Sequence, residues 1–294
     1  MTELIYITPE YYGSCYVVRD PENAILFDPG MAWHAPQTIA KVRDACQGRV
    51  LRAIYLTHSH YDHISALPYF KKAWPGVPVY AAAYVQKVLG KASARATMKK
   101  LSEDAALSNG TTLPEGFDED LLTVDLAIAD GDTFDFGEIH MEAVECIGHT
   151  KDSYSYVIND HMMIASETLG MIYTTGCYEP QCLVSFIEGA KSLEKCSHYN
   201  IDCYAMPHLG PIADFTAKGM WDVFKKGLED SKNQILGILR TCPDFEAQIK
   251  AMDRAFLDHR GAELIAAWPY DAFYLNAQAM LKTIAREEAE RQGA

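Results

Sequence analysis

The chain has 294 residues, and its 40 Asp and Glu outnumber its 26 Lys and Arg, which gives a formal net charge of -14. A surplus of negative charge repels phosphate backbones on average and argues against a nucleic-acid-binding protein. No run approaches the ~18 consecutive apolar residues of a membrane-spanning helix, and the first residues lack a signal-peptide pattern. The eight cysteines include no C-x-x-C pair. We therefore expect a protein of the reducing cytoplasm whose partner is neither a nucleic acid nor a membrane.

A buried strand is predicted from Leu51 to Leu56, a short apolar run with β-branched and aromatic side chains. The sequence Thr-His-Ser-His-Tyr-Asp-His follows directly at residues 57–63. His58 and His60 are two residues apart, so in extended backbone both rings project from one face. This spacing predicts that the two imidazoles bind one metal ion.

Asp62 and His63 follow where the chain turns toward a helix predicted over residues 65–74. An adjacent pair in a turn can face a second point nearby, which allows a second metal ion. The alternative is a polar loop that is rich in histidine by chance. Three imidazoles and a carboxylate within six residues favour metal binding.

Residues 87–120 are predicted to be helical and then irregular. Basic side chains from Lys87 to Lys100 mostly recur at helical spacing, which indicates a solvated helix face rather than a nucleic-acid site. The stretch from Glu103 to Asp120 contains Asn-Gly and Pro-Glu-Gly, so we interpret it as a loop insertion.

Three more potential ligands each follow a predicted strand. They are His149 after residues 141–147, Glu167 at the end of residues 162–167, and His208 after a short strand that begins at Tyr204. Taken singly, a histidine in a loop is usually solvated, and Glu167 could begin a helix. Their shared position at strand ends favours one common metal site built from imidazoles and a carboxylate.

After Pro211 the pattern changes to helix. Apolar residues recur at helical intervals in three stretches, which begin at Trp221, Phe245 and Phe273. We predict one domain over residues 1–212 and a helical subdomain over residues 213–294 that packs on it.

The motif at residues 57–63, Gly148-His149-Thr150, an acid after a strand and Pro207-His208 resemble the metallo-β-lactamase superfamily in order and spacing. The match covers roughly residues 1–212. The resemblance implies an α/β fold, a four-layer αβ/βα sandwich with the site at one edge between its two sheets.

The N-terminal part resembles the same family. Residues 14–18 and 24–30 match its two opening strands, and Asp28 matches an Asp at a strand end beside the metal loop. The resemblance implies that Asp28 orients a ligand ring by accepting its N–H. Asp28 also begins an Asp-Pro-Gly turn, and both roles can hold.

Carried over residue by residue, the resemblance implies two groups of metal ligands: His58, His60 and His149 on one divalent ion, Asp62, His63 and His208 on the other, and Glu167 with a water or hydroxide between them. The family normally has Asp where this chain has Glu167, and the extra methylene moves the carboxylate by about 1.5 Å. We expect Glu167 still to bridge, and binding to one ion is the alternative. Imidazole and carboxylate suit zinc, iron and manganese, of which we expect zinc first.

The helical extension resembles that of PqsE-like and glyoxalase II-like thioesterases, whose helices cover the site. The resemblance implies a metal-dependent hydrolase that cleaves a small acyl thioester, ester or lactone through a metal-bridging hydroxide. A thiolate leaves with little acid assistance, because thiols have a pKa of about 8 to 9. An amide needs a proton donor, for which Asp62 and metal-bound water are the candidates. β-Lactamase-like amide hydrolysis is therefore the less favoured alternative.

Two alternatives come from other functional classes. One is an oxidoreductase with a single iron, similar to the persulfide dioxygenases of this fold. The other is a regulatory ligand-binding protein that has lost useful turnover, which the substitution at Glu167 permits. The expected partner is a small-molecule substrate, and a homodimer is left open.

Aromatic residues are candidates for lining a substrate pocket beneath the helices: Tyr173, Tyr178, Trp268, Tyr270, Phe273 and Tyr274. Core packing is the alternative for aromatics at helical spacing. Cys177 and Cys182 follow Glu167 and could touch substrate or sense oxidation, but buried, unreactive thiols are the favoured interpretation.

Overall fold

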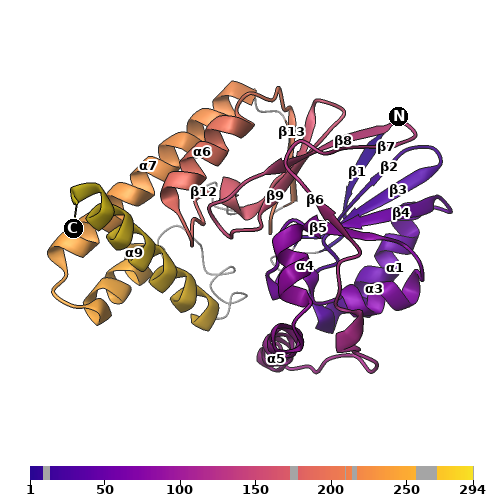
Figure 1. Cartoon of the computed structure of the whole chain (residues 1–294), viewed down its shortest axis with the longest axis horizontal. Helices are drawn as coiled ribbons and strands as arrows, with labels where there is room; N and C mark the ends of the chain where they lie inside the picture. Colours follow the sequence, from indigo (N-terminus) through magenta and orange to yellow (C-terminus); the bar gives the residue numbers. More distant parts are fainter. Residues whose placement is uncertain (9–13, 173–177, 209, 214–216, 256–269, 294) are drawn as a thin grey trace.

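Two β-sheets packed face to face, with helices on both outer sides, form the body of the protein (Figure 1). The computed structural model describes residues 1–8, 14–172, 178–208, 210–213, 217–255 and 270–293. Side chains are not described at residues 213, 217, 218 and 270–273. The arrangement confirms the predicted α/β fold, a four-layer αβ/βα sandwich followed by C-terminal helices.

The first sheet has its strands in chain order, and they are β1 (Glu3–Tyr6), β2 (Tyr16–Arg19), β3 (Asn23–Phe27), β4 (Val50–Tyr55), β5 (Val79–Ala82) and β6 (Leu126–Ile128). The first three strands pair antiparallel, whereas β3 to β6 run parallel. Parallel neighbours need a crossover connection, and helices supply each one.

The second sheet has the order β14-β13-β10-β9-β8-β7, and its strands are β7 (Thr133–Phe136), β8 (Ile139–Glu145), β9 (Tyr154–Ile158), β10 (Met162–Ile164), β13 (Cys203–Met206) and β14 (Gly210–Ala213). Only β10 and β13 pair in parallel; the other neighbours are antiparallel. A separate two-stranded sheet joins β11 (Met171–Ile172) to β12 (Tyr178–Glu179).

Helices connect the strands and cover both sheets. Those of the first half are η1 (Ala32–His34), α1 (Ala35–Cys46), α2 (Tyr61–Ile64), α3 (Leu67–Ala73), α4 (Ala83–Leu89), α5 (Ala92–Ser108) and η2 (Glu119–Leu121). Those of the second half are η3 (Glu167–Leu169), α6 (Phe186–Cys196), α7 (Ala217–Thr241), a helix over residues 245–255, and α9 (Tyr270–Gln292).

The second sheet is buried on both faces. In β9, Tyr156 and Ile158 belong to the core between the sheets, whereas Val157 belongs to the core beneath the C-terminal helices. Successive side chains of a strand point to opposite faces, so burial on both faces requires an apolar run without polar alternation. This is why the central strands read as continuous hydrophobic segments.

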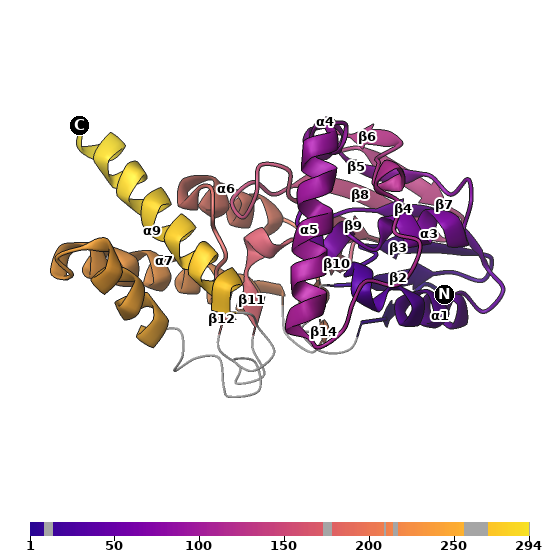
Figure 2. The same ribbon diagram turned by 90° about the horizontal axis from the view of Figure 1, so that it is seen from below.

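The C-terminal helices pack on the outer face of the second sheet, and the two termini lie at opposite ends of the molecule (Figure 2). Trp221 of α7 contacts Tyr204 of β13, with ring centroids 5.6 Å apart. The three predicted helices therefore form where expected. The division of the chain after residue 212 stays a prediction, because β14 completes the second sheet across it.

Two local differences from the sequence-based expectation have simple causes. The first sheet begins with β1, one strand before the expected opening strands, because Leu4 and Tyr6 pack against the central core. The predicted loop from Glu103 to Asp120 is shorter than expected, since α5 continues to Ser108. Its buried Ala105 and Ala106 hold the last turns against the protein.

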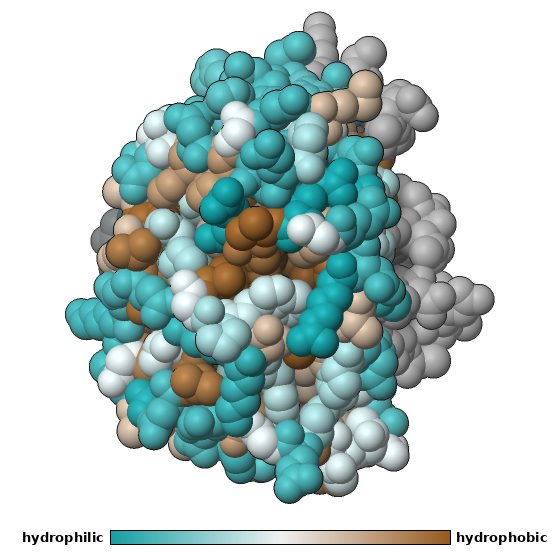
Figure 3. All heavy atoms as spheres, turned by 90° about the vertical axis from the view of Figure 1, so that its right-hand side faces the viewer, coloured by the Kyte–Doolittle hydropathy of each residue, from teal (hydrophilic) through white to brown (hydrophobic). Residues whose placement is uncertain are grey.

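The basic side chains of α5 pair with acids, as expected for a solvated helix face. Lys99 and Lys100 lie 2.6 and 2.9 Å from Glu103 and Asp104, four residues further along the helix. The face of the sandwich away from the C-terminal helices is mostly hydrophilic, with hydrophobic side chains gathered in a central hollow (Figure 3). None of the helices in the described ranges combines the length and apolar character needed to cross a membrane.

Candidate metal centre

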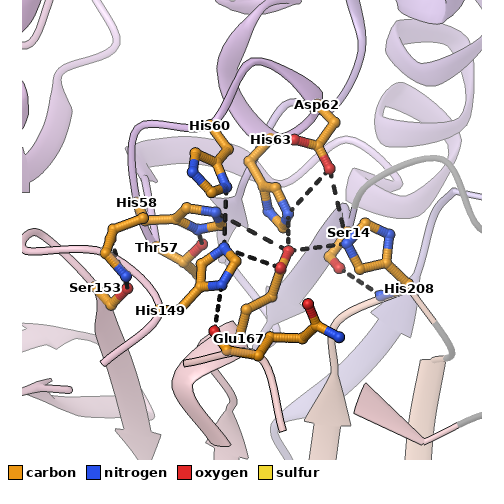
Figure 4. Close-up of polar contacts among 12 residues, drawn as sticks. Ser14, Thr57, His58, His60, Asp62, His63, His149, Ser153, Glu167 and His208 are labelled. Atoms are coloured by element: carbon orange, nitrogen blue, oxygen red, sulfur yellow. Dashed lines mark hydrogen bonds and ion pairs between the residues drawn. The ribbon is translucent and has the colours of Figure 1, made fainter. Parts of the chain in front are cut away.

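All of the predicted ligands lie at one edge of the sandwich, beyond the ends of strands (Figure 4). β3 and β4 are parallel, so Asp28 and His58 follow them at the same edge. β8, β10 and β13 also run in one direction, because β9 is antiparallel to both β8 and β10 and β13 is parallel to β10. The segments after these three strands carry His149, Glu167 and His208. Strand direction alone therefore brings distant residues together.

The first group of side chains consists of His58, His60, His149 and Glu167, whose potential ligand atoms lie within 4.8 Å of one another. His149 Nε2 lies 2.9 Å from His60 Nδ1 and 3.0 Å from Glu167 Oε2. His58 Nε2 is buried and has no hydrogen-bond partner among the described residues. A buried polar atom is costly unless something completes its bonding, and a cation at this point would do so.

The second group consists of Asp62, His63, His208 and Glu167, again with ligand atoms within 4.8 Å of one another. Glu167 Oε1 lies 2.6 Å from His63 Nε2 and 2.8 Å from His208 Nε2. Asp62 Oδ2 lies 3.6 and 3.7 Å from the same two nitrogens. These are the residues that the sequence assigns to a second ion.

Glu167 belongs to both groups and presents one carboxylate oxygen to each. Oε2 faces His149, and Oε1 faces His63 and His208. The residue begins the short helix η3, and its side chain is only 6% exposed. The longer side chain thus still reaches the position between the groups, although bridging of two ions stays a prediction.

Asp28 accepts hydrogen bonds from two neighbours in the interior. Its Oδ2 accepts one from His63 Nδ1 at 2.8 Å and another from Thr57 Oγ1 at 2.6 Å. Its Oδ1 accepts the backbone N–H of Thr57 at 2.8 Å. This is the ring contact that the sequence assigns to Asp28, and it turns His63 Nε2 toward Glu167.

His149 is fixed by groups that sequence reasoning missed. Its Nδ1–H donates to the carbonyl oxygen of Gln181 at 2.7 Å, and its backbone N–H donates to Thr168 Oγ1 at 2.9 Å. A protonated Nδ1 leaves Nε2 as the nitrogen available to a metal. The other missed contact is Ser14 Oγ, which accepts the backbone N–H of His208 at 2.9 Å. No motif marks these partners, because they are ordinary residues far away in sequence.

Burial and neighbouring charges separate the histidines into two classes. Burial lowers the pKa of His58 well below its ordinary value and that of His149 to about 4. Burial acts the same way on His63 and His208, but nearby carboxylates outweigh it and raise both pKa values. Burial raises the pKa of Glu167, yet His149 and His208 hold it well below its usual range. Protons compete with a cation for these imidazole nitrogens, so metal affinity falls as pH falls.

The donor set fits a hard or borderline divalent cation. It offers imidazole nitrogens and carboxylate oxygens, and no cysteine thiolate belongs to either group within the described chain. Such ligands suit zinc, iron and manganese alike. The residues therefore could hold one metal ion in each group, and they leave its identity open.

Tyr178, a predicted pocket residue, packs in the interior of the C-terminal region. Its hydroxyl donates to the carbonyl of Leu169 at 2.9 Å, and its ring lies 5.1 Å from that of Phe224. A methyl group added at Gly170 or Gly227 would collide with this ring. The contacts give Tyr178 a packing role and tie the turn of Glu167 to α7, while a role in substrate binding stays a prediction.

The remaining predicted pocket residues are described only in part. Tyr274 lies on α9 and is 37% exposed. Tyr270 and Phe273 belong to the same helix, but their side chains lie outside the described residues, as do Tyr173, Trp268 and Cys177 altogether. Cys182 is buried against Gly189, which agrees with the favoured interpretation of an unreactive thiol.

Curated proteins that resemble this chain include hydrolases by name. It is 28% identical over 154 residues to a probable metallo-hydrolase of Bacillus subtilis, which covers 52% of this chain and 64% of the relative. It is 26% identical over 164 residues to a hydroxyacylglutathione hydrolase of Bradyrhizobium, which covers 55% of this chain and 49% of the relative. The chain therefore spans less than two thirds of the length of these relatives.

Solved structures with the same fold extend over nearly the whole chain. A metallo-β-lactamase family protein of Thermus thermophilus covers 98% of this chain and 94% of its own at 16% identity, with a TM-score of 0.63. An archaeal superfamily protein of Sulfolobus tokodaii covers 96% and 98% at 16% identity, with a TM-score of 0.59. The family model of the metallo-β-lactamase superfamily matches residues 8–164, more than half of the chain, including residues 57–63 and His149. The chain belongs to the metallo-β-lactamase superfamily.

Proposed function

We propose that this chain is a metal-dependent hydrolase that cleaves small acyl thioesters, with esters and lactones as related substrates. The observation that carries the proposal is the single carboxylate of Glu167 between two groups of ligands, with one oxygen toward each. Relatives named hydroxyacylglutathione hydrolase support the thioester class, because an acylglutathione is a thioester.

The chain would hold two divalent cations, zinc in the first place and iron or manganese as alternatives. His58, His60 and His149 would bind one ion, Asp62, His63 and His208 the other, and Glu167 both. When bound, such ions would lower the pKa of a coordinated water molecule and polarise the carbonyl oxygen of the substrate.

The protein side chains contribute orientation and proton exchange. Asp28 and the carbonyl of Gln181 fix the rings of His63 and His149, so that each Nε2 faces the centre. Asp62 is the more exposed acid of the site, at 18% against 6% for Glu167, and is the group placed to exchange a proton with a leaving group. A thiolate needs little of this help, which is why a thioester fits better than an amide.

Turnover assays on the metal-loaded protein test the proposal. Protein loaded with zinc, iron or manganese is given a panel of acyl thioesters, esters and lactones, and thiol or acid release is measured. We expect turnover of thioesters, its loss on chelation, and its loss in His58→Ala. His140→Ala is the matched control, since that imidazole is 66% exposed on β8. Absence of turnover with all three metals across the panel would contradict the proposal.

The same preparations test the other classes. Oxygen uptake by iron-loaded protein would identify the oxidoreductase, and tight metal binding without turnover would identify the regulatory binding protein. We propose a small-molecule substrate and leave a homodimer to direct measurement of mass in solution. A reducing compartment such as the cytoplasm fits the seven described cysteines, all of them free thiols.

A further inference from the structure

The last helix contacts the segment that leads into α6. Thr283 and Glu287 are four residues apart on α9, so they share one face of the helix. Thr283 Oγ1 donates to the carbonyl of Leu183 at 2.7 Å, and Glu287 Oε1 accepts from Ser185 Oγ at 2.6 Å. Thr283 and Glu287 are 4% and 6% exposed. The contacts are therefore sheltered from water.

The same segment holds the loop of His149. The backbone N–H groups of Val184 and Ser185 donate to the carbonyl of Gly148 at 3.0 and 3.2 Å. The carbonyl of Gln181 accepts from His149 Nδ1 at 2.7 Å. One short stretch of chain thus bonds to α9 on one side and to the predicted ligand on the other.

The loop of His149 packs tightly against α6 and is hydrogen-bonded to it. A Cβ added at Gly148 would lie 2.6 Å from Thr168 Cγ2 and 2.8 Å from the Cα of Gly189 in α6. Ser192 Oγ, one turn further along α6, donates to the carbonyl of Ile147 at 2.8 Å. A shift of α6 or of the segment before it would therefore carry His149 with it.

The second ligand group is supported from elsewhere. His63 bonds to Asp28 beyond β3, and the backbone of His208 bonds to Ser14 before β2. Five hydrogen bonds join α9 to Gln181 and to residues 183–187, on the His149 side of the centre. Glu167 is common to both groups, but the bonds that hold His149 and those that hold His63 and His208 come from different elements.

We propose that α9 is a positioning element for the first ligand group, in which Thr283 and Glu287 act as positioning residues for His149 through the segment of residues 181–185. The inference rests on the proposed metal-dependent function. Its consequence is specific: loss of the contacts of the last helix weakens mainly the ion held by His58, His60 and His149, because the other ion shares only Glu167 with that group.

Zinc titration of the full chain tests this. Metal-free wild type, Glu287→Met and Glu290→Met compete for zinc with a chromophoric chelator. Methionine keeps the length of the side chain and removes the hydrogen-bond acceptor. Glu290→Met is the control, because it makes the same substitution on the exposed side of α9. We expect one of the two ions to bind about tenfold more weakly in Glu287→Met and the other to change by less than about twofold. Glu290→Met should match wild type.

Two further measurements separate positioning from loss of folding. The visible absorption of cobalt-loaded protein reports ligand geometry directly and should change in Glu287→Met while the far-ultraviolet circular dichroism stays that of wild type. Thr283→Val is nearly isosteric, carries the test if Glu287→Met does not fold, and should weaken the same ion by about threefold. Unchanged affinities in the folded variants, or equal weakening of both ions, would overturn the inference.

The two proposals fail in different ways. Selective weakening of one ion in a protein that hydrolyses no thioester supports the role of α9 and removes the proposed reaction. Thioester turnover with unaltered zinc affinities in the variants removes the role of α9 alone. A wild-type protein that binds no zinc, iron or manganese removes both.

Discussion

The loop of residues 58–63 and the turns that carry His149, Glu167 and His208 build one centre in different ways. The loop places three imidazoles and a carboxylate through local spacing after a single strand, β4. The three turns follow three separate strands of the second sheet. Their convergence depends on strand direction and on hydrogen-bond partners such as Gln181, which no local sequence pattern predicts.

The comparison shows where the centre is vulnerable. Side chains within one loop share one backbone, and this loop is held chiefly by Asp28, which directly follows the neighbouring strand β3. His149 instead depends on α6, on the segment before it and on α9, which comes from the far end of the chain. Four expected outcomes test this contrast.

The largest effect is expected where the two regions meet, at Glu167. Glu167→Ala removes the oxygens shared by both groups and should lower kcat/KM by about 10³-fold, with loss of at least one bound ion. Glu167→Asp keeps the charge but draws the oxygens back by about 1.5 Å, so its loss should be intermediate. Glu246→Ala, an exposed acid on the helix of residues 245–255, is the control. Full activity in Glu167→Ala would show that the two regions do not share a ligand.

The support of the histidine-rich loop is tested at Asp28. Asp28→Asn weakens the acceptor for His63 Nδ1 and Thr57 Oγ1, so we expect metal affinity to fall by about 10- to 100-fold. Thr57→Val removes one of these two donors, and its metal affinity should fall by less. Isothermal titration with zinc gives both values. Equal losses in the two variants would mean that Thr57, rather than the ring of His63, is what Asp28 holds.

The crowding around His149 is tested at Gly148. Gly148→Ala places a methyl group against Thr168 and Gly189 and should destabilise the fold by about 3 kcal/mol while lowering activity. Gly237→Ala is the matched control, because nothing lies within 4 Å of a Cβ at that position in α7. There the change should stabilise the helix by up to about 1 kcal/mol. Denaturant unfolding measures the stability of both variants. An unchanged stability in Gly148→Ala would show that the loop can shift to accommodate the methyl group.

The smallest effect is expected at a contact between the sheets that lies away from the centre. Asp20 accepts backbone N–H groups of Glu22, Asn23 and Glu138. Burial alone would raise its pKa, but these donors lower the pKa of Asp20 to about 2. The carboxylate therefore stabilises the fold above a pH of about 4, and this contribution is lost as pH falls toward about 2.

Unfolding of Asp20→Asn by urea checks the sign of this dependence. The variant should be less stable than wild type by about 1 to 2 kcal/mol near neutral pH, with the difference shrinking as wild-type Asp20 becomes protonated. Zinc affinity should stay that of wild type. A difference that grows on acidification would contradict the assignment.

Many residues of the centre were predictable because the ends of strands can be recognised in a sequence. Apolar runs that stop at His58, His149 and His208 mark the edge where side chains leave the core. The resemblance to a known family then assigned the two groups, and the structure assembles those same groups. The expected loop after Glu103 was too long because propensity says little about where a packed helix ends.

The aromatic residues predicted to line a substrate pocket show what helical spacing leaves open. Tyr178 is an aromatic residue of the kind that often lines pockets, and its ring fills the space beside Gly170 and Gly227. Helical spacing predicts that a residue faces the protein interior, but it does not identify the residue that it packs against. Packing partners are chosen by surfaces that come together only after folding.

By itself, the sequence determined the strand ends that carry the ligands and the nitrogen and oxygen chemistry of the centre, because both depend on short-range pattern. The fold class followed from the resemblance to a known family. Only the tertiary structure decided which oxygen of Glu167 faces which group, that a main-chain carbonyl at Gln181 turns Nε2 of His149 toward the centre, and that the last helix bonds to the segment beside His149. Those features depend on contacts between residues about 100 positions apart, as between Ser185 and Glu287, and such contacts leave no periodic trace along the chain.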